Sequence, residues 1–329
     1  MRVVDSATMT ASWGQNPVES YVSHPPSQEG VLFDMTGSLR ATDKRTVEGG
    51  TLYLGTFATG LAMHRVGIYT PSEYSLDRSV PIIAMTTPLG TGNRGHNHEV
   101  AMDMMQEGAV VIKKGPPRYY GPTLHALSLE EDENEVFKVI NATEQTGLIP
   151  KDVSVSIYGE SQGAMKALMA PKIGALMGRE VTYILPVAPC FLEKIQWNRP
   201  DRQIRALANV TLGFVRQARS MSLEEIAAKR GTVSHKDVHH HLIVLPVLTS
   251  GEAGEALVHI PPTQDGDVLV FGRDGWSKPR KTKARIEDET NLDVHLFDNY
   301  GHVDGILSAE TKQFRHAMVN RLQERARAA

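Results

Sequence analysis

The stretch that most constrains the fold is residues 153–169, which read VSVSIYGESQGAMKALM. Its first half is rich in β-branched and aromatic residues, which favour a strand, and its second half is rich in strong helix formers. The pentapeptide Gly159-Glu160-Ser161-Gln162-Gly163 lies between the two halves. The sequence therefore predicts a strand, a sharp turn and a helix, with the Ser161 hydroxyl exposed at the turn.

The G-x-S-x-G spacing of this turn is typical of a nucleophilic serine. Glycine has no Cβ, so the two glycines let neighbouring backbone pass close to the turn. The predicted helix points its N-terminus at Ser161, and the unpaired N–H groups there suit a negatively charged oxygen forming on a bound carbonyl. The same residues could form an ordinary turn in which Ser161 is a helix N-cap. The strand before the turn and the helix after it favour the nucleophile.

Length and charge exclude several classes of protein. The chain has 329 residues, enough for one large α/β domain or a domain with an insertion. A net charge of -3 without a polybasic stretch argues against nucleic acid or an anionic membrane as the main partner. A single cysteine, Cys190, cannot form an internal disulfide. With neither a signal peptide at residues 1–17 nor an apolar run of about 18 residues, we expect a cytoplasmic protein without stable membrane insertion.

Short apolar runs alternate with helical patterns along most of the chain, which predicts a mostly parallel central sheet flanked by helices. A hairpin-like pair of strands is expected at residues 51–57 and 63–70. Buried strands are expected at residues 81–85, 109–112 and 181–187, and further strands of the sheet are expected at residues 153–158, 268–271 and 293–297. Helices are expected at residues 100–106, at 128–149, directly after Ser161, and at 307–325, with Pro171 ending or kinking the third of them.

The predicted α/β core comprises residues 49–190 and 266–329. Residues 1–48 are rich in serine, threonine, proline and glycine, so we expect an irregular N-terminal arm there. Residues 191–265 are too many for an ordinary connection between two strands, and their apolar residues near helical spacing predict an inserted helical cap. The acidic run at residues 130–135 is expected on a solvated helix face, because carboxylates in the first turns suit the helix dipole.

A nucleophilic serine needs a base within hydrogen-bond reach, and the base needs a third group that fixes its tautomer. In open parallel sheets, ligand chemistry lies beyond the carboxyl ends of the strands, so loops directly after strands are the places to search. One such loop is GRDGW, which contains Asp274, and the other is DNYGH, which contains Asp298 and His302. An aspartate in GRDG is also a good turn residue.

Together, strand-GESQG-helix, VLVFGRDGW and HLFDNYGHVDG resemble the α/β-hydrolase fold, whose catalytic triad runs in the order serine, acid, histidine. The resemblance covers residues 51–325 apart from the cap. It implies that Ser161 is the nucleophile, Asp274 the acid and His302 the base. Asp298 is the rival acid nearest in sequence, but it lies four residues before His302, and we expect it to build a turn. Glu193 is a rival acid, because some members of this family carry the acid after an earlier strand.

The resemblance also implies an oxyanion hole made of two backbone N–H groups. One comes from Gln162, the residue after the nucleophile, and the other from the loop after residues 81–85. Where many relatives have His-Gly, this loop reads Thr87-Pro88-Leu89-Gly90. Proline has no N–H to donate, so Leu89 is the expected donor, with Gly90 and Thr87 as alternatives.

Two groups of histidines could suggest a metal site. His96 and His98 could face one ion if their segment were extended, and residues 239–241 add three consecutive histidines. Neither group comes with a carboxylate and a third histidine at a recognised spacing, so we expect no metal. The glycine-rich GTGNRG lacks the spacing of a P-loop or a dinucleotide site, so no nucleotide cofactor is expected either.

These features predict a serine hydrolase, without a cofactor, that cleaves a small-molecule carboxylic ester through an acyl-enzyme intermediate. A thioesterase, an amidase, a perhydrolase-like enzyme and a non-catalytic binding protein on the same fold are the alternatives. The sequence leaves the formation of a homo-oligomer open. An apolar acyl substrate is suggested by residues of the cap and by methionines near the expected pocket, although methionines also fill cores: Leu207, Val210, Leu212, Phe214, Met102, Met104, Met105, Met165 and Met169.

Overall fold

The computed structural model describes residues 38–58, 62–76, 79–86, 94–115, 118–119, 129–189, 257–274 and 277–328. Most of the expected arm and nearly all of the expected cap lie outside these residues, as does the expected oxyanion donor Leu89. None of the helices within the described ranges is long and apolar enough to cross a membrane.

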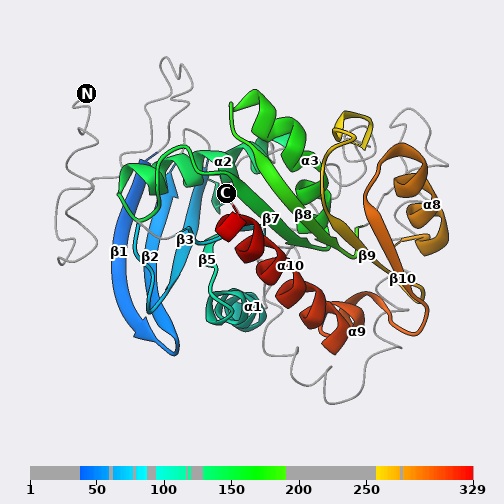
Figure 1. Cartoon of the computed structure of the whole chain (residues 1–329), viewed down its shortest axis with the longest axis horizontal. Helices are drawn as coiled ribbons and strands as arrows, with labels where there is room; N and C mark the ends of the chain where they lie inside the picture. Colours follow the sequence, from blue (N-terminus) through cyan, green and yellow to red (C-terminus); the bar gives the residue numbers. More distant parts are fainter. Residues whose placement is uncertain are drawn as a thin grey trace.

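One mixed sheet forms the centre of the molecule (Figure 1). Its strands are β1 (Ser38–Val47), β2 (Gly50–Ala58), β3 (Ala62–Pro71), β4 (Ile82–Thr86), β5 (Val110–Lys114), β6 (Arg118–Tyr119), β7 (Val155–Glu160), β8 (Val181–Val187), β9 (Asp267–Phe271) and β10 (Asp293–Phe297). The strand order is β1-β2-β3-β5-β4-β7-β8-β9-β10, and β6 pairs with β3. The strands from β5 to β10 along this order are parallel, whereas β1, β2 and β3 are antiparallel to their neighbours.

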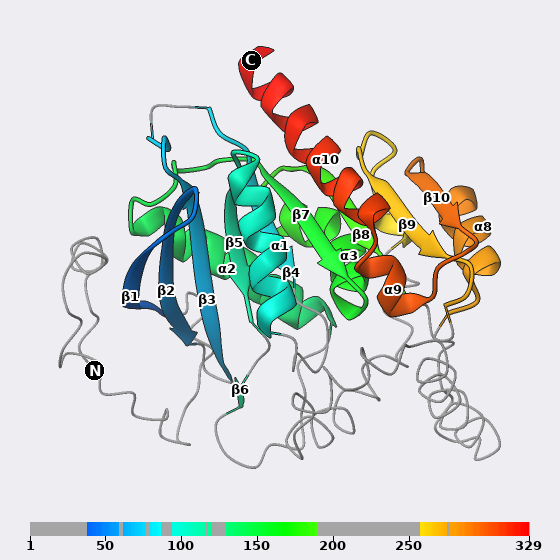
Figure 2. The ribbon, with the colours of Figure 1, turned by 90° about the horizontal axis from the view of Figure 1, so that it is seen from below.

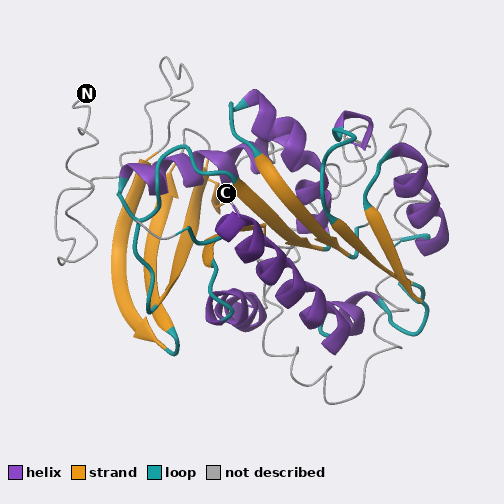
Figure 3. Cartoon of the chain, in the orientation of Figure 1, coloured by secondary structure: helices purple, strands orange, loops and turns teal. Residues whose placement is uncertain are grey.

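Helices cover both faces of the sheet (Figures 2 and 3). They are α1 (Arg94–Gln106), α2 (Leu129–Gln145), α3 (Gln162–Leu176), α8 (Pro279–Glu289), α9 (His302–Ile306) and α10 (Ala309–Ala328), with a short 3-10 helix at Leu257–His259. Helices α1 and α10 pack on one face, and α2, α3 and α8 pack on the other. Successive strand residues point to opposite faces, so Ile82 and Ala84 join one apolar cluster while Ile83 and Met85 join the other. The predicted sheet flanked by helices is confirmed.

Strand β1 corrects the prediction of an irregular arm over residues 1–48. It pairs with β2 along its whole length, apart from a register shift between Ala41 and Asp43. Its sequence, SLRATDKRTV, is mostly polar and charged, so the alternation of apolar residues that indicates a strand is missing. Charged side chains are common on edge strands, where they discourage pairing with other chains. Helix α3 likewise continues past Pro171 to Leu176 and does not end there.

Most of the acidic run in α2 is buried, so the prediction of a solvated face is wrong for Asp132, Glu133 and Glu135, whereas Glu131 is exposed. Asp132 and Glu133 are 5% and 0% exposed. Asp132 accepts a hydrogen bond of 2.5 Å from Lys114 of β5 and forms an ion pair with Lys166 of α3. The lysines that compensate the run come from other elements, so a reading of the helix alone could not find them. Buried charges need such partners because isolated ions are poorly solvated inside proteins.

Glu133 differs from Asp132 because neither of its carboxyl oxygens has a hydrogen-bond partner among the described residues. Burial raises its pKa from 4.5 to about 8, although Lys166 and Lys114 oppose the shift. Since the unfolded chain releases this proton above pH 4.5 and the folded chain retains it up to about pH 8, stability falls as the pH rises through this window. At pH 7 the ionisation of Glu133 in the unfolded chain lowers the free energy of unfolding by about 3 kcal/mol.

Glu133→Gln is therefore expected to stabilise the protein at pH 7 by up to about 3 kcal/mol. Glutamine is neutral and close in shape to the protonated acid, so it removes the titration and little else. Urea unfolding of both proteins at pH 7 and near pH 4.5 measures the effect. The stabilisation should nearly vanish at the lower pH, and an equal difference at both pH values would contradict the assignment.

Candidate active site

The connections between strands place the topological switch point of the sheet between β4 and β7. Strand β4 pairs with β5 on one side and with β7 on the other, with Thr86 opposite Gly159. The helix after β4 is α1 and the helix after β7 is α3, and these two pack on opposite faces of the sheet. Ligands of open α/β sheets bind beyond the carboxyl ends of the strands at such a point. Ser161 follows β7 directly and therefore lies there.

The turn that carries Ser161 is strained. Ser161 has φ 56° and ψ -116°, a positive φ that side chains other than glycine rarely adopt. A Cβ on Gly159 would lie 2.1 Å from the carbonyl oxygen of Gly163, and a Cβ on Gly163 would lie 2.4 Å from that of Thr86. Both positions therefore require glycine, which explains the spacing around the serine. The Ser161 N–H donates to the Val187 carbonyl at 2.8 Å, which ties the turn to β8.

The structure brings Ser161, His302 and Asp274 together in a line of hydrogen bonds. His302 Nε2 lies 2.8 Å from Ser161 Oγ, and His302 Nδ1 lies 2.7 Å from Asp274 Oδ2. His302 and Asp274 are buried, whereas Ser161 is half-buried. A carboxylate only accepts, so it holds the proton of the imidazole on Nδ1 and leaves Nε2 facing the serine hydroxyl.

The loops after β9 and β10 hold the acid and the histidine at this distance. The Arg273 N–H donates to the Tyr300 carbonyl at 2.9 Å, and the Gly272 N–H donates to the Phe297 carbonyl at 2.9 Å. Asp298 lies in the turn after β10, against Gly272, while Asp274 contacts the imidazole. The rival acid Glu193 lies outside the described residues.

The first turn of α3 begins at Gln162, beside the serine. The first N–H groups of an α-helix have no acceptor within the helix, so they can point at a ligand. Thr86 Oγ1 donates to the Gly163 carbonyl at 2.8 Å and thereby fixes this turn to the end of β4. Leu89, expected to supply the second N–H, lies outside the described part of the chain, as do Gly90 and Thr87.

The histidines near this site have different partners. The segment of His96 and His98 is helical, so the condition for a shared metal ion, an extended segment, is not met. His96 Nε2 lies 2.8 Å from Glu160 Oε2, whereas His98 Nδ1 lies 3.0 Å from the Tyr69 hydroxyl. Among the described residues, no three histidine, cysteine or acidic side chains are grouped as a metal site would need. Residues 239–241 are outside the described ranges.

The pairing of His96 with Glu160 is absent from the sequence prediction. Glu160 stands in the G-x-S-x-G turn at a position that the motif leaves free, and His96 comes 64 residues earlier. Four of the five methionines proposed to line a pocket are core residues, since Met104, Met105, Met165 and Met169 are at most 3% exposed, whereas Met102 is half-buried. The four core methionines therefore do not support an apolar substrate, and the apolar residues of the cap lie outside the described ranges.

No protein-family model matches the chain, and no curated protein sequence matches it. Solved structures do resemble it. The enol-lactonase from Burkholderia xenovorans LB400 has 11% identity and a TM-score of 0.55, covering 79% of this chain and 96% of that one. The α/β hydrolase GrgF from Penicillium sp. sh18 has 11% identity and a TM-score of 0.53, covering 82% and 96%.

The thioesterase domain from the curacin biosynthetic pathway has 15% identity and a TM-score of 0.53, covering 82% of this chain and 99% of that one. Likeness at such identities concerns the fold, and function lies in the site. This likeness agrees with a sheet whose strands are mostly parallel and whose two faces are covered by helices. The chain has the α/β-hydrolase fold.

Proposed function

We propose that this protein is a serine hydrolase that cleaves carboxylic esters. The observation that supports the proposal is the line of hydrogen bonds from Ser161 through His302 to Asp274, at the carboxyl edge of the sheet. Ser161 Oγ attacks the ester carbonyl while His302 Nε2 takes its proton, and the same imidazole then protonates the leaving alcohol. Asp274 keeps the imidazole in the required tautomer and stabilises the imidazolium.

The carbonyl oxygen becomes negatively charged in the tetrahedral intermediate. The proposed donors to that charge are the N–H of Gln162, which begins α3 directly after Ser161, and the N–H of Leu89. Water then attacks the acyl-enzyme, with His302 as the base, and Ser161 is regenerated. Every proton moves through His302, so the proposed reaction needs no cofactor.

A thioester is the second candidate substrate, because one structural neighbour is a thioesterase domain. The two substrates would use the same three side chains. The geometry of the triad does not separate them, since both pass through the same acyl-enzyme. Amide cleavage and perhydrolysis remain alternatives without an observation that favours them.

The proposed function is tested with a fluorophosphonate probe and two substrate series. We expect covalent labelling of wild-type protein, mapped to Ser161 by mass spectrometry, and hydrolysis of p-nitrophenyl esters from acetate to long acyl chains. The preferred acyl chain length indicates the size of the pocket that binds the acyl group. Thioesters with the same acyl chains test the second candidate substrate. Folded protein that is neither labelled nor active on either series would contradict the proposal.

A further inference from the structure

A buried carboxylate lies next to the nucleophile and is held from two sides. Glu160 directly precedes Ser161 and is 1% exposed. Its Oε2 accepts a hydrogen bond of 2.8 Å from His96 Nε2, and its Oε1 accepts a short hydrogen bond from the Tyr158 hydroxyl. Charge-assisted hydrogen bonds of this kind are stronger than neutral ones, and more so when buried.

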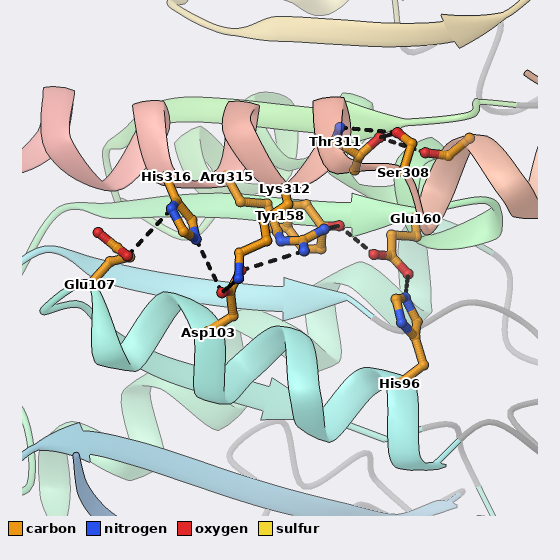
Figure 4. A network of polar contacts seen from close by, with 11 residues as sticks. His96, Asp103, Glu107, Tyr158, Glu160, Ser308, Thr311, Lys312, Arg315 and His316 are labelled. Carbon is orange, nitrogen blue, oxygen red and sulfur yellow. Dashed lines mark hydrogen bonds and ion pairs between the residues drawn. The ribbon is translucent and has the colours of Figure 1, made fainter. Parts of the chain in front are cut away.

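These contacts extend to Arg315 and Asp103 (Figure 4), and the backbone of α1 closes them into a ring. Arg315 of α10 donates from Nη1 to the Tyr158 hydroxyl at 3.3 Å and from Nη2 to Asp103 Oδ2 at 3.4 Å. Asp103 lies on α1, the helix that also carries His96. The ring therefore passes from His96 to Glu160, Tyr158, Arg315 and Asp103, and returns to His96 through α1. We call these five residues the polar ring.

The direction of each bond in the polar ring is fixed by the charges. Burial raises the pKa of Tyr158 well above its ordinary value, and Glu160 raises it further, so the hydroxyl keeps its proton and donates to the carboxylate. Burial lowers the pKa of Arg315, but Tyr158 and Glu160 outweigh this effect and the net shift is upward. Arg315 therefore stays a cation between two acidic residues.

The polar ring joins three elements that the proposed reaction uses. Strand β7 leads into Ser161, and α10 directly follows α9, whose first residue is His302. Helix α1 follows β4, whose end is fixed to the first turn of α3 by Thr86. A displacement of about 1 Å between reacting groups can reduce a rate about 100-fold, so the relative placement of these elements matters for catalysis.

We propose that the polar ring is a positioning device for the active site and that His96, through Glu160, is a positioning residue of the proposed hydrolase. The proposal rests on the proposed function. His96 Nε2 joins the first turn of α1 to the last residue of β7, while the Arg315 bridge joins the last turn of α1 to the same strand through Tyr158. Loss of the His96 contact removes the hydrogen bond at the start of α1, and the nucleophile turn loses one of the two groups that hold Glu160.

The test compares three variants of α1. His96→Leu removes the donor, His96→Gln keeps an N–H that can reach Glu160, and His98→Leu is the matched control because His98 contacts Tyr69 outside the polar ring. We expect His96→Leu to lower kcat for the best ester about 10- to 100-fold with KM changed less than about twofold. His96→Gln should recover most of the rate, and His98→Leu should keep it.

A second variant tests whether the two contacts of Glu160 act as one unit. Tyr158→Phe removes the hydroxyl that links Glu160 to Arg315, so its effect on kcat should not add to that of His96→Leu if both act through one ring. Additive effects, an unchanged kcat in His96→Leu, or an equal loss in His98→Leu would each overturn this proposal in an active enzyme. A wild-type protein that is neither active nor labelled would instead overturn the proposed function, and the polar ring's role with it.

Discussion

Ser161→Ala and His302→Ala are each expected to lower kcat for ester hydrolysis by about a million-fold, and the double variant should fall no further. The two side chains act as one unit, since His302 Nε2 is 2.8 Å from Ser161 Oγ and neither transfers the proton alone. Once either is lost, the remaining rate comes from binding and from the N–H groups of the oxyanion hole, so removing the second changes little.

The acid is tested by a matched pair of substitutions in neighbouring loops. Asp274→Asn keeps the shape of the side chain but offers an amide to His302 Nδ1, which favours the wrong tautomer and should lower kcat about 10,000-fold. Asp298→Asn, in the turn after β10, should leave kcat near the wild-type value. Steady-state kinetics on the best ester, with thermal unfolding as the check on folding, measures all of these variants. A larger loss in Asp298→Asn than in Asp274→Asn would reassign the acid.

The arrangement of Ser161, Asp274 and His302 could be predicted because each follows a recognisable strand. Parallel strands bring their carboxyl ends to one edge, so three loops that are distant in the sequence meet there without any information about packing. The local turn at Ser161 could also be predicted, because the two glycines of the G-x-S-x-G spacing mark it in the sequence. In the structure, only glycine fits at Gly159 and Gly163.

Contacts between side chains of different helices could not be predicted in this way. Glu160 stands at an unspecified position of the motif, and its environment depends on His96 of α1, which contacts it, and on Arg315 of α10, which contacts Tyr158. The acidic run of α2 had the composition of a solvated face, and its burial depends on lysines of β5 and α3. Strand β1 has too few apolar residues to be predicted as a strand. As an edge strand, it is identified only by its hydrogen bonds with β2.

Asp132→Asn is expected to destabilise the fold by about 3 to 5 kcal/mol at pH 7. Asp132 is the shared counter-ion of Lys114 and Lys166, both 3% exposed, and asparagine has no charge to compensate them. Burial raises the pKa of Asp132, but the two lysines outweigh it and hold that pKa far below its ordinary value of 3.8. The stabilisation is therefore present above pH 3.8 and is lost as the pH falls below it.

Denaturant unfolding at several pH values measures this loss, with an exposed ion pair as the control. Glu287 pairs with Lys283 on the surface of α8, and Glu287→Gln should change stability by at most about 0.5 kcal/mol. The difference between wild type and Asp132→Asn should shrink on acidification below about pH 4, because the wild-type carboxylate then approaches protonation in the unfolded chain. A loss no larger than that of the control would show that Asp132 is not needed as a counter-ion.

The effect of Glu133→Gln should reverse its sign when Asp132 is absent. In the wild type, the charge of Asp132 is one of the influences that raise the pKa of Glu133, while Lys166 and Lys114 lower it. Asp132→Asn removes the first influence and leaves the lysines without their shared counter-ion, so Glu133 should ionise and take over that role. Glu133→Gln then stabilises the wild type at pH 7 but destabilises Asp132→Asn, a coupling that a double-mutant cycle measures directly. The same sign in both backgrounds would mean that Glu133 does not interact with the two lysines.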